Sequence, residues 1–434
     1  MTNHFSAEYA RCCGLSVFRH IRTDPLFAGF EKLLSFLSGA VSFNAGEALS
    51  CAGEFLLLLA ERSGNCRNLS WSTAVEELVL RDENPYTRAA ENAGDESGGS
   101  VPEALSSLAE HDLESLRILA ALPPGKIMGA VEELCGAAGA LPSGLFEDEA
   151  DGKAEGLLPL EKLLSQWSRG AGVFYGADSF VWESEGLVPV QTPDPISLEQ
   201  LIGYEAQREV VLENTRRFAA GFRANNLLLY GDRGTGKSAT IKAAARALAV
   251  ERVKIIEVRK QQLSEFPRII GLLRNRNFRF IIFIDDLSFD RADESYVGLK
   301  ALLEGGLETR PENVLLYATS NRRHLVKERV QDRIGLGSVD AETEIRAQDS
   351  LQEQLSLADR FGMTVVFSAP LQDEYLEIVQ GMIENRGITA DREKALADAL
   401  RWEKWYNGRS PRTARQFVDW LEGGEAAPWD RTEE

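Results

Sequence analysis

Apolar residues recur at helical spacing through the first part of the chain. Near the N-terminus these positions are Leu26, Phe30, Leu33 and Leu37. Side chains three or four residues apart lie on one face of an α-helix, so the spacing predicts a helix with one buried face. Similar stripes occur within residues 47–60, 71–80, 102–122 and 157–167. The pattern therefore predicts a mostly α-helical N-terminal domain over residues 1–170.

The pattern changes between residues 171 and 195. Aromatic residues such as Trp182 stand there among glycines, and two prolines follow them. This composition suits short strands or an extended connector, and we assign residues 171–195 as the connector between two domains. Ser197 and Gln200 then have the spacing of a capping box, which predicts that a helix begins at this point.

Short apolar runs alternate with helical stretches from residue 201 to about residue 370. The runs with the length of buried strands are residues 226–230, 253–258, 280–284, 314–318 and 364–367. The helical stretches between them are residues 237–250, 262–276, 296–304 and 350–360. This alternation predicts an α/β fold, in which a parallel sheet carries helices on both faces. After Pro370 only helical patterns follow, at residues 372–384, 391–406 and 411–421.

The charge balance bears on the class of partner. Against 48 Lys and Arg residues the chain has 67 Asp and Glu residues, and its net charge is −19. This balance argues against a protein coated in basic surface for nucleic acid, although it allows a local basic patch.

Cysteine spacing and apolar run length indicate the compartment. The five cysteines form no CxxC pair, which indicates free thiols in a reducing compartment rather than a metal site. The N-terminus lacks the apolar segment of a signal peptide, and the longest apolar run, residues 55–60, is too short to span a bilayer. We therefore expect a cytoplasmic protein that does not associate with membranes.

Residues 231–238 carry the clearest chemistry in the chain. They read Gly-Asp-Arg-Gly-Thr-Gly-Lys-Ser and match the pattern GxxxxGK[ST], after a predicted strand and before a predicted helix. Glycines allow backbone N–H groups to surround phosphate oxygens, and a helix N-terminus favours negative charge. We expect Lys237 to reach the β- and γ-phosphates of ATP and Ser238 to bind Mg²⁺. The expected nucleotide-binding residues are Gly231, Asp232, Arg233, Gly234, Thr235, Gly236, Lys237 and Ser238.

Two adjacent carboxylates, Asp285 and Asp286, follow the apolar run at residues 280–284. An acid at a strand end beside a phosphate-binding loop can hold Mg²⁺ directly or through water, and we assign this role to Asp285. Asp286 is then the candidate to polarise the water that attacks the γ-phosphate. The alternative is that an Asp here only caps the end of the strand.

Two further polar residues suit a nucleotide site but also have ordinary alternatives. Asn321 follows the strand predicted at residues 314–318, where it would position water near the γ-phosphate or serve as a turn residue. Arg360 precedes the last predicted strand, where its guanidinium would stabilise charge on a transferred phosphoryl group or lie on the surface.

Taken together, these motifs resemble those of the AAA+ ATPases over residues 196–421. In the order of that family, Walker A is at residues 231–238, Walker B at 280–286, sensor 1 at Asn321, the arginine finger at Arg360 and sensor 2 at Arg412. Residues 302–325 resemble more specifically a bacterial family of predicted AAA+ ATPases without an assigned function.

The resemblance implies an architecture and an assembly. It implies an αβα core with a five-stranded parallel sheet over residues 196–370, followed by a helical lid and a C-terminal tail over residues 371–434. It also implies a homo-oligomer with ATP sites between subunits, because the arginine finger serves the ATP of a neighbour. Most AAA+ ATPases have Glu where this chain has Asp286, whose side chain is one methylene shorter. This departure predicts slow hydrolysis, or a partner that closes the site.

Three functions fit these features. The first is an AAA+ ATPase that couples binding and hydrolysis of Mg-ATP to assembly and to action on a macromolecular partner. The second is an ATP-gated adaptor or switch that hydrolyses ATP slowly or not at all, with the helical N-terminal domain as its interaction module. The third, a small-molecule kinase, is disfavoured by the lid and the paired sensors. The partner would be a protein or DNA, and the basic residues near the motifs suit either a DNA-binding surface or a salt-bridged surface: Lys254, Arg259, Lys260, Arg322, Arg323 and Lys327.

Overall fold

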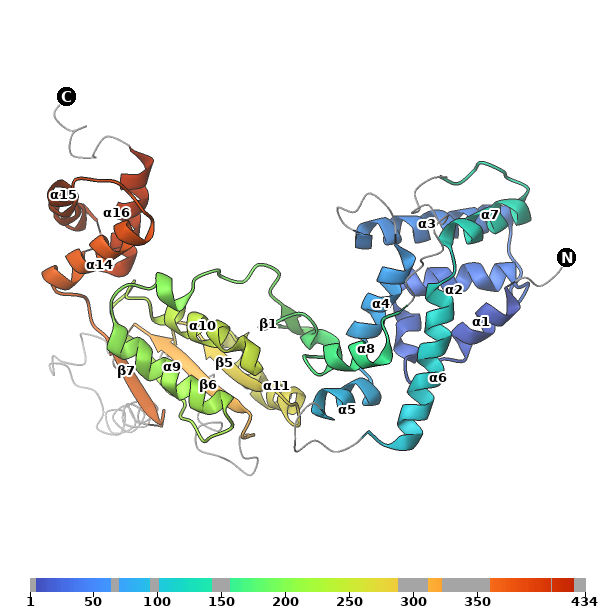
Figure 1. Cartoon of the computed structure of the whole chain (residues 1–434), viewed down its shortest axis with the longest axis horizontal. Helices are drawn as coiled ribbons and strands as arrows, with labels where there is room; N and C mark the ends of the chain where they lie inside the picture. Colours follow the sequence, from blue (N-terminus) through green and yellow to red (C-terminus); the bar gives the residue numbers. More distant parts are fainter. Residues whose placement is uncertain are drawn as a thin grey trace, which may run out of the picture. The chain divides into compact units, whose positions relative to one another are not determined.

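The chain forms two compact units in the computed structural model, unit 1 at Met1–Gly176 and unit 2 at Ala177–Glu434 (Figure 1). The structure describes residues 5–63, 70–93, 101–142, 157–287, 311–321, 360–406 and 408–424. Within those ranges, none of the helices combines the length and the apolar character that a bilayer crossing requires. The helix predicted at residues 296–304, and nearly all of the one predicted at 350–360, lie outside the described residues.

Unit 1 is built from α-helices, as the apolar stripes predict. The helices are α1 (Ser6–Cys13), α2 (Pro25–Leu37), α3 (Ala45–Ser63), α4 (Trp71–Arg81), α5 (Pro85–Ala93), α6 (Glu103–Ala120), α7 (Pro124–Cys135) and α8 (Leu160–Trp167). Helix α2 shows how the local sequence determines where a helix begins, since the Asp24 carboxylate caps its first turn and Pro25 occupies the first helical position. Its apolar face enters an aromatic core, where the rings of Phe30 and Trp71 lie 4.2 Å apart.

A buried carboxylate ties α6 to the segment between α1 and α2. Asp112 is fully buried, and its Oδ2 accepts backbone hydrogen bonds from Ser16 at 2.8 Å, Val17 at 2.7 Å and Phe18 at 3.1 Å. This segment lies outside regular helix, so the carboxylate supplies the acceptor that its N–H groups need, above all those of the buried residues Val17 and Phe18. Asp112 therefore stabilises the fold of unit 1.

Replacing Asp112 with Ala is expected to destabilise unit 1 by about 3 kcal/mol or more, because the buried N–H groups lose their acceptor. Urea unfolding followed by amide exchange of α1 and α6 measures the effect. Glu110→Ala is the matched control, since Glu110 lies on the same helix but is exposed. Equal unfolding midpoints for the two variants would contradict the role given to Asp112.

Unit 2 contains a seven-stranded sheet with the order β2-β1-β4-β5-β6-β3-β7. Every neighbouring pair is parallel except the hairpin of β1 and β2. The α/β core with a mostly parallel sheet is therefore confirmed, and all five predicted strands are present. The strands are β1 (Ser179–Glu183), β2 (Gly186–Pro189), β3 (Leu227–Gly231), β4 (Val253–Glu257), β5 (Arg279–Ile284), β6 (Val314–Ser320) and β7 (Met363–Phe367).

The predicted number of five strands is wrong, because the expected connector supplies β1 and β2. Phe180 and Trp182 alternate along β1 and are buried, which explains why this segment joins the sheet rather than crossing solvent. Lys254 of β4 holds the start of β1 in place, since its buried ammonium donates to Ala177 O at 2.6 Å and lies 3.1 Å from Asp178 Oδ1. Lys254 is thus part of the sheet and does not belong to a basic surface.

Helices cover the sheet, and three helices with a shared core follow it, which we call the lid after the predicted domain. Helices α9 (Glu205–Ala219) and α10 (Lys237–Ala247) pack on the face that includes Leu227 and Leu229 (Figure 1). Residues on the other face, such as Leu228, are also buried, as expected for a parallel sheet between two layers. The remaining helices are α11 (Phe266–Leu273) of the core and α14 (Gln372–Asn385), α15 (Arg392–Trp405) and α16 (Pro411–Gly423) of the lid.

The helix predicted to begin after Ser197 is only a single 3₁₀ turn, at Leu198–Gln200. The long helix α9 begins later, at Glu205. Left-handed backbone at Gly203 (φ 80°) and Tyr204 (φ 60°) separates the two, because helical conformation cannot continue through these residues. The capping box is present, but it caps this short turn.

Candidate functional site

The predicted motifs meet at one edge of the sheet of unit 2. In the register of the strands, Tyr230 pairs with Ser320 and Ile284 pairs with Ala318. The segments that follow β3, β5 and β6 therefore leave the sheet side by side, at the carboxyl ends of parallel strands. A cavity of about 610 Å³ opens there, lined by residues 233–238 of the phosphate loop (residues 231–238), by the two carboxylates, by Asn321 and by residues of the lid.

The phosphate loop requires its glycines. Gly231 has φ 142°, and a Cβ at this position would lie 2.0 Å from the carbonyl oxygen of Phe367. Gly234 and Gly236 have φ of 79° and 92°, which side-chain-bearing residues adopt only with strain. The last of them is the N-cap of α10, so the helix N-terminus faces the cavity. The loop thus has the backbone shape and the partial positive charge that a phosphate group needs.

Lys237 lies at the centre of the site. Its buried Nζ donates to Gly231 O at 3.0 Å, to Asp232 O at 2.6 Å and to Asn321 Oδ1 at 3.1 Å. Burial lowers the pKa of the ammonium, and the nearby carboxylates, Asp232 first among them, oppose this shift. The ammonium is therefore held in place by neutral oxygens that a phosphate, as a stronger acceptor, can replace.

Two hydroxyl groups converge on Asp285. Ser238 Oγ lies 2.6 Å and Thr319 Oγ1 lies 2.5 Å from the same oxygen, Asp285 Oδ1. A carboxylate and a serine hydroxyl beside a phosphate site are the hard oxygen ligands that Mg²⁺ prefers, so these residues fit the ion. Thr319 was missed in the sequence, where the only signal was its place two residues before Asn321 at the end of a predicted strand.

Asp286 has an unusual backbone and is held by Asn321. Its φ is 50°, in the left-handed region that Asp tolerates better than most residues. Its N–H donates to Thr319 Oγ1 at 3.0 Å, and its Oδ1 accepts from Asn321 Nδ2 at 2.7 Å. Asn321 thereby connects the Lys237 ammonium with the Asp286 carboxylate. The structure brings these three predicted residues together.

The lid contributes two arginines to the cavity. Arg412, predicted from the resemblance alone, lines it, and its backbone N–H donates to Gly234 O at 3.1 Å. Arg415 lies one turn further along α16 and also lines the cavity. Its spacing of three residues from Arg412 on a helix was the available signal, because such residues share one face. The cationic side chains of the lining outnumber its two carboxylates, which suits a polyanionic ligand: Arg208, Arg233, Lys237, Arg412 and Arg415.

The predicted loop residues Gly231 and Asp232 do not line this cavity, and neither does Arg360. Arg360 precedes β7, whose first residue, Met363, pairs with Leu227 at the start of β3. The phosphate loop follows the opposite end of β3, so the sheet separates Arg360 from the site of its own chain. A role for Arg360 in the site of a neighbouring subunit stays a prediction.

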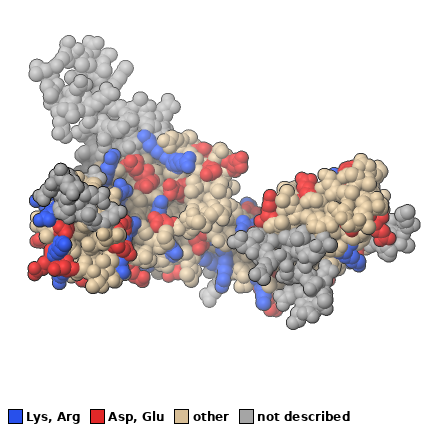
Figure 2. Space-filling model, turned by 90° about the horizontal axis from the view of Figure 1, so that it is seen from above, with Lys and Arg blue, Asp and Glu red and all other residues tan. Residues whose placement is uncertain are grey.

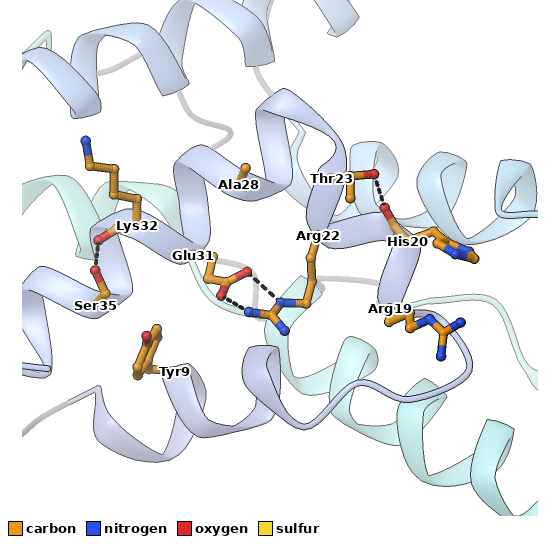
Figure 3. Close-up of a pocket in the computed structure, with 9 residues that line it drawn as sticks. All are labelled: Tyr9, Arg19, His20, Arg22, Thr23, Ala28, Glu31, Lys32 and Ser35. Atoms are coloured by element: carbon orange, nitrogen blue, oxygen red, sulfur yellow. Dashed lines mark hydrogen bonds and ion pairs between the residues drawn. The ribbon is translucent and has the colours of Figure 1, made fainter. Parts of the chain in front are cut away.

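Unit 1 contains a second cavity, of about 650 Å³, with a different character. Two of its charged side chains pair with each other, since Arg22 Nε lies 2.9 Å from Glu31 Oε2 and Arg22 Nη2 lies 2.5 Å from Glu31 Oε1. Figure 3 shows these two side chains facing each other, whereas Lys32 and Arg19 point in other directions. The cationic groups do not converge, so unit 2 holds the better candidate site.

The surface gives no broad basic field on the face of the described residues shown in Figure 2. Lys and Arg side chains lie there between Asp and Glu side chains. Of the six basic residues near the motifs, Lys254 is buried, and Arg322, Arg323 and Lys327 lie outside the described residues. The described face in Figure 2 therefore offers no basic surface that favours a nucleic-acid partner.

A family model matches the region that carries the site. Residues 176–425, more than half of the chain, match the family described as "Protein of unknown function (DUF815)". The solved structure of the Thermotoga maritima RuvB Holliday junction branch migration motor is 19% identical, over 54% of this chain and 67% of that chain, with a TM-score of 0.36. AMPPCP-bound DnaA from Aquifex aeolicus is 14% identical, over 56% of this chain and 70% of that chain, with a TM-score of 0.37. No curated protein matches the chain significantly.

Proposed function

This chain belongs to the DUF815 family, and we propose that it is an AAA+ ATP hydrolase. It binds Mg-ATP in the cavity of unit 2 and couples binding and hydrolysis to assembly with other copies and to action on a protein or DNA partner. The observation that carries the proposal is the hydrogen-bonded series Lys237–Asn321–Asp286 beside the group of Ser238, Asp285 and Thr319. These groups in one cavity suit a phosphate contact, a magnesium site and an acid that orients water, which supports the proposal.

Each group has a defined task in hydrolysis. The loop N–H groups and Lys237 bind the phosphates, and Ser238 and Asp285 would hold Mg²⁺, which would supply positive charge beside the phosphates. Asp286 accepts a proton from the attacking water as the water oxygen bonds to the γ-phosphorus. The bond from phosphorus to the bridging oxygen breaks at the same time, and that oxygen leaves with ADP. Arg412 from the lid, and Arg360 from a neighbouring subunit, stabilise the charge that develops on the transferred group.

A slow ATP-gated switch is the second candidate, and the geometry of Asp286 favours it. The carboxylate is short, and Asn321 already holds one of its oxygens at 2.7 Å. A water would have to share this group or displace the amide. The site would then bind ATP firmly but turn it over only when a partner rearranges these residues.

The ATPase rate per molecule should rise with protein concentration, by about tenfold or more, because an arginine supplied by a neighbour contributes far more than that in related enzymes. The measurement covers a wide concentration range, with Lys237→Ala as the blank. A constant rate well above the blank would contradict sites shared between subunits. A rate equal to the blank at every concentration, with ATP bound, would identify the switch.

A further inference from the structure

Four residues, 368–371, join the sheet to the lid, since β7 ends at Phe367 and α14 begins at Gln372. We call them the hinge segment. Its start is held by hydrogen bonds from two directions. Ala369 N–H donates to Asp232 Oδ2 at 2.7 Å, and the Tyr204 hydroxyl donates to Ser368 O at 2.6 Å. The hinge segment is therefore attached to the phosphate loop through the side chain of Asp232.

Asp232 contacts the hinge and the phosphate-binding lysine at the same time. Its backbone N–H donates to Phe367 O at 2.9 Å, immediately before the hinge segment. Its backbone oxygen accepts from Lys237 Nζ at 2.6 Å and from Thr235 Oγ1 at 2.9 Å. Asp232 thus contacts the phosphate-binding Lys237 through its backbone oxygen and the hinge segment through its carboxylate.

The packing around Asp232 leaves little room for independent movement. The Cα of Gly231 is so close to Phe367 that a Cβ would lie 2.0 Å from its carbonyl oxygen. Further along the loop, a Cβ at Gly234 would lie 2.9 Å from Ser410 Oγ at the start of α16. Because close-packed groups move together, a shift of the loop must also move the hinge segment.

Phosphate chemistry does not explain a carboxylate at this position. The loop pattern leaves it open to any residue, and a negative charge beside the phosphates opposes the binding of an anion. The charge-assisted hydrogen bond to the Ala369 amide does account for it, since such bonds are stronger than neutral ones. The electrostatic disadvantage is therefore offset by the attachment to the hinge.

We propose that Asp232 is a positioning residue that couples the occupancy of the phosphate loop to the position of the lid. The inference rests on the proposed nucleotide site. When phosphates take the Lys237 ammonium, the Asp232 carbonyl loses that donor, and the loop adjusts around it. The Asp232 carboxylate moves with the loop and carries the Ala369 amide, so α14 changes its angle to the sheet.

Amide exchange of the full chain, with and without a saturating non-hydrolysable ATP analogue, tests this coupling. In Asp232→Ala the Ala369 amide should exchange about tenfold faster than in the wild type, since one hydrogen bond is lost. The nucleotide-induced change in exchange of α14 and α16 should also disappear. Asp232→Asn is the matched control, because it keeps an acceptor oxygen without the charge. It should retain the lid response and bind the nucleotide several-fold more tightly.

Two results would contradict the proposed role of Asp232. Both can be distinguished from a result that contradicts the nucleotide site itself. A lid response in Asp232→Ala equal to that of the wild type, at saturation, would show that another contact transmits the signal. An unchanged Ala369 exchange rate in the nucleotide-free variant would show that the carboxylate does not hold the hinge. Absence of nucleotide binding by the wild type, in a direct titration, would instead contradict the proposed function, while the nucleotide-free comparison would still test the attachment.

Discussion

Replacing Asp286 with Asn should lower the rate of ATP turnover by about 10²- to 10⁴-fold, the usual contribution of a general base, while ATP stays bound. Asn tolerates the left-handed backbone at this position, where φ is 50°, as well as Asp does. Its amide oxygen can still accept the hydrogen bond that Asn321 Nδ2 donates at 2.7 Å. The variant therefore removes the charge and the proton acceptor and leaves the surrounding contacts in place.

Single-turnover hydrolysis and the nucleotide content of the purified variant measure the two effects separately. A second variant, Asp286→Glu, tests whether the short side chain limits the wild type. It should raise turnover if reach is limiting, although Glu tolerates left-handed backbone less well than Asp. Turnover by Asp286→Asn at the wild-type rate would show that another group orients the water.

Replacing Gly231 with Ala should destabilise unit 2 by more than about 4 kcal/mol, which places it among the most severe single substitutions. The new methyl group would lie 2.0 Å from Phe367 O, and the φ of 142° is itself unfavourable for Ala. Neither atom can retreat, because Gly231 and Phe367 are paired residues of β3 and β7. Urea unfolding followed by amide exchange of β3 and β7 measures the loss.

Gly387→Ala is the matched control for backbone conformation. Gly387 has φ 64°, but nothing lies within 4 Å of a Cβ built there. Its replacement should therefore show only the strain of left-handed backbone, about 1–2 kcal/mol. If the two variants unfolded at the same urea concentration, the close approach of β7 to the phosphate loop would not be rigid.

The parts of the site that are contiguous in the chain were predictable from sequence. The phosphate loop and the pair Asp285 and Asp286 each follow a buried strand, and the chemistry of each can be inferred from neighbouring residues alone. Thr319 and Arg415 were not predictable in this way. Thr319 reaches Asp285 because β5 and β6 are paired in a particular register, and Arg415 reaches the cavity because the lid packs against the loop. Such contacts depend on tertiary structure.

The number of strands was predicted wrongly for a related reason. The aromatic alternation along β1 suits a strand, but a strand of five residues becomes stable only against a neighbour, and its neighbour β4 lies about seventy residues further along the chain. Sequence periodicity does not contain that distant pairing. Lys254 was assigned to a possible basic surface for the same reason. A lysine within an apolar run gives no indication that its ammonium has oxygen acceptors at Ala177 and Asp178, just before β1.

The hairpin of β1 and β2 also determines where the nucleotide-binding unit can be cut from the rest of the chain. A fragment that began at residue 196, where the motif resemblance begins, would lack the hairpin and leave β4 as an open edge strand. Its backbone groups on the edge away from β5 would then be free to pair with other chains, and the Lys254 ammonium would lose its acceptors at Ala177 and Asp178. A fragment that began at residue 177 would instead end the sheet at a four-residue strand that contains Pro189, a residue with no N–H to offer an incoming strand. The first fragment would be expected to aggregate, and the second to remain monodisperse, although both contain every nucleotide motif.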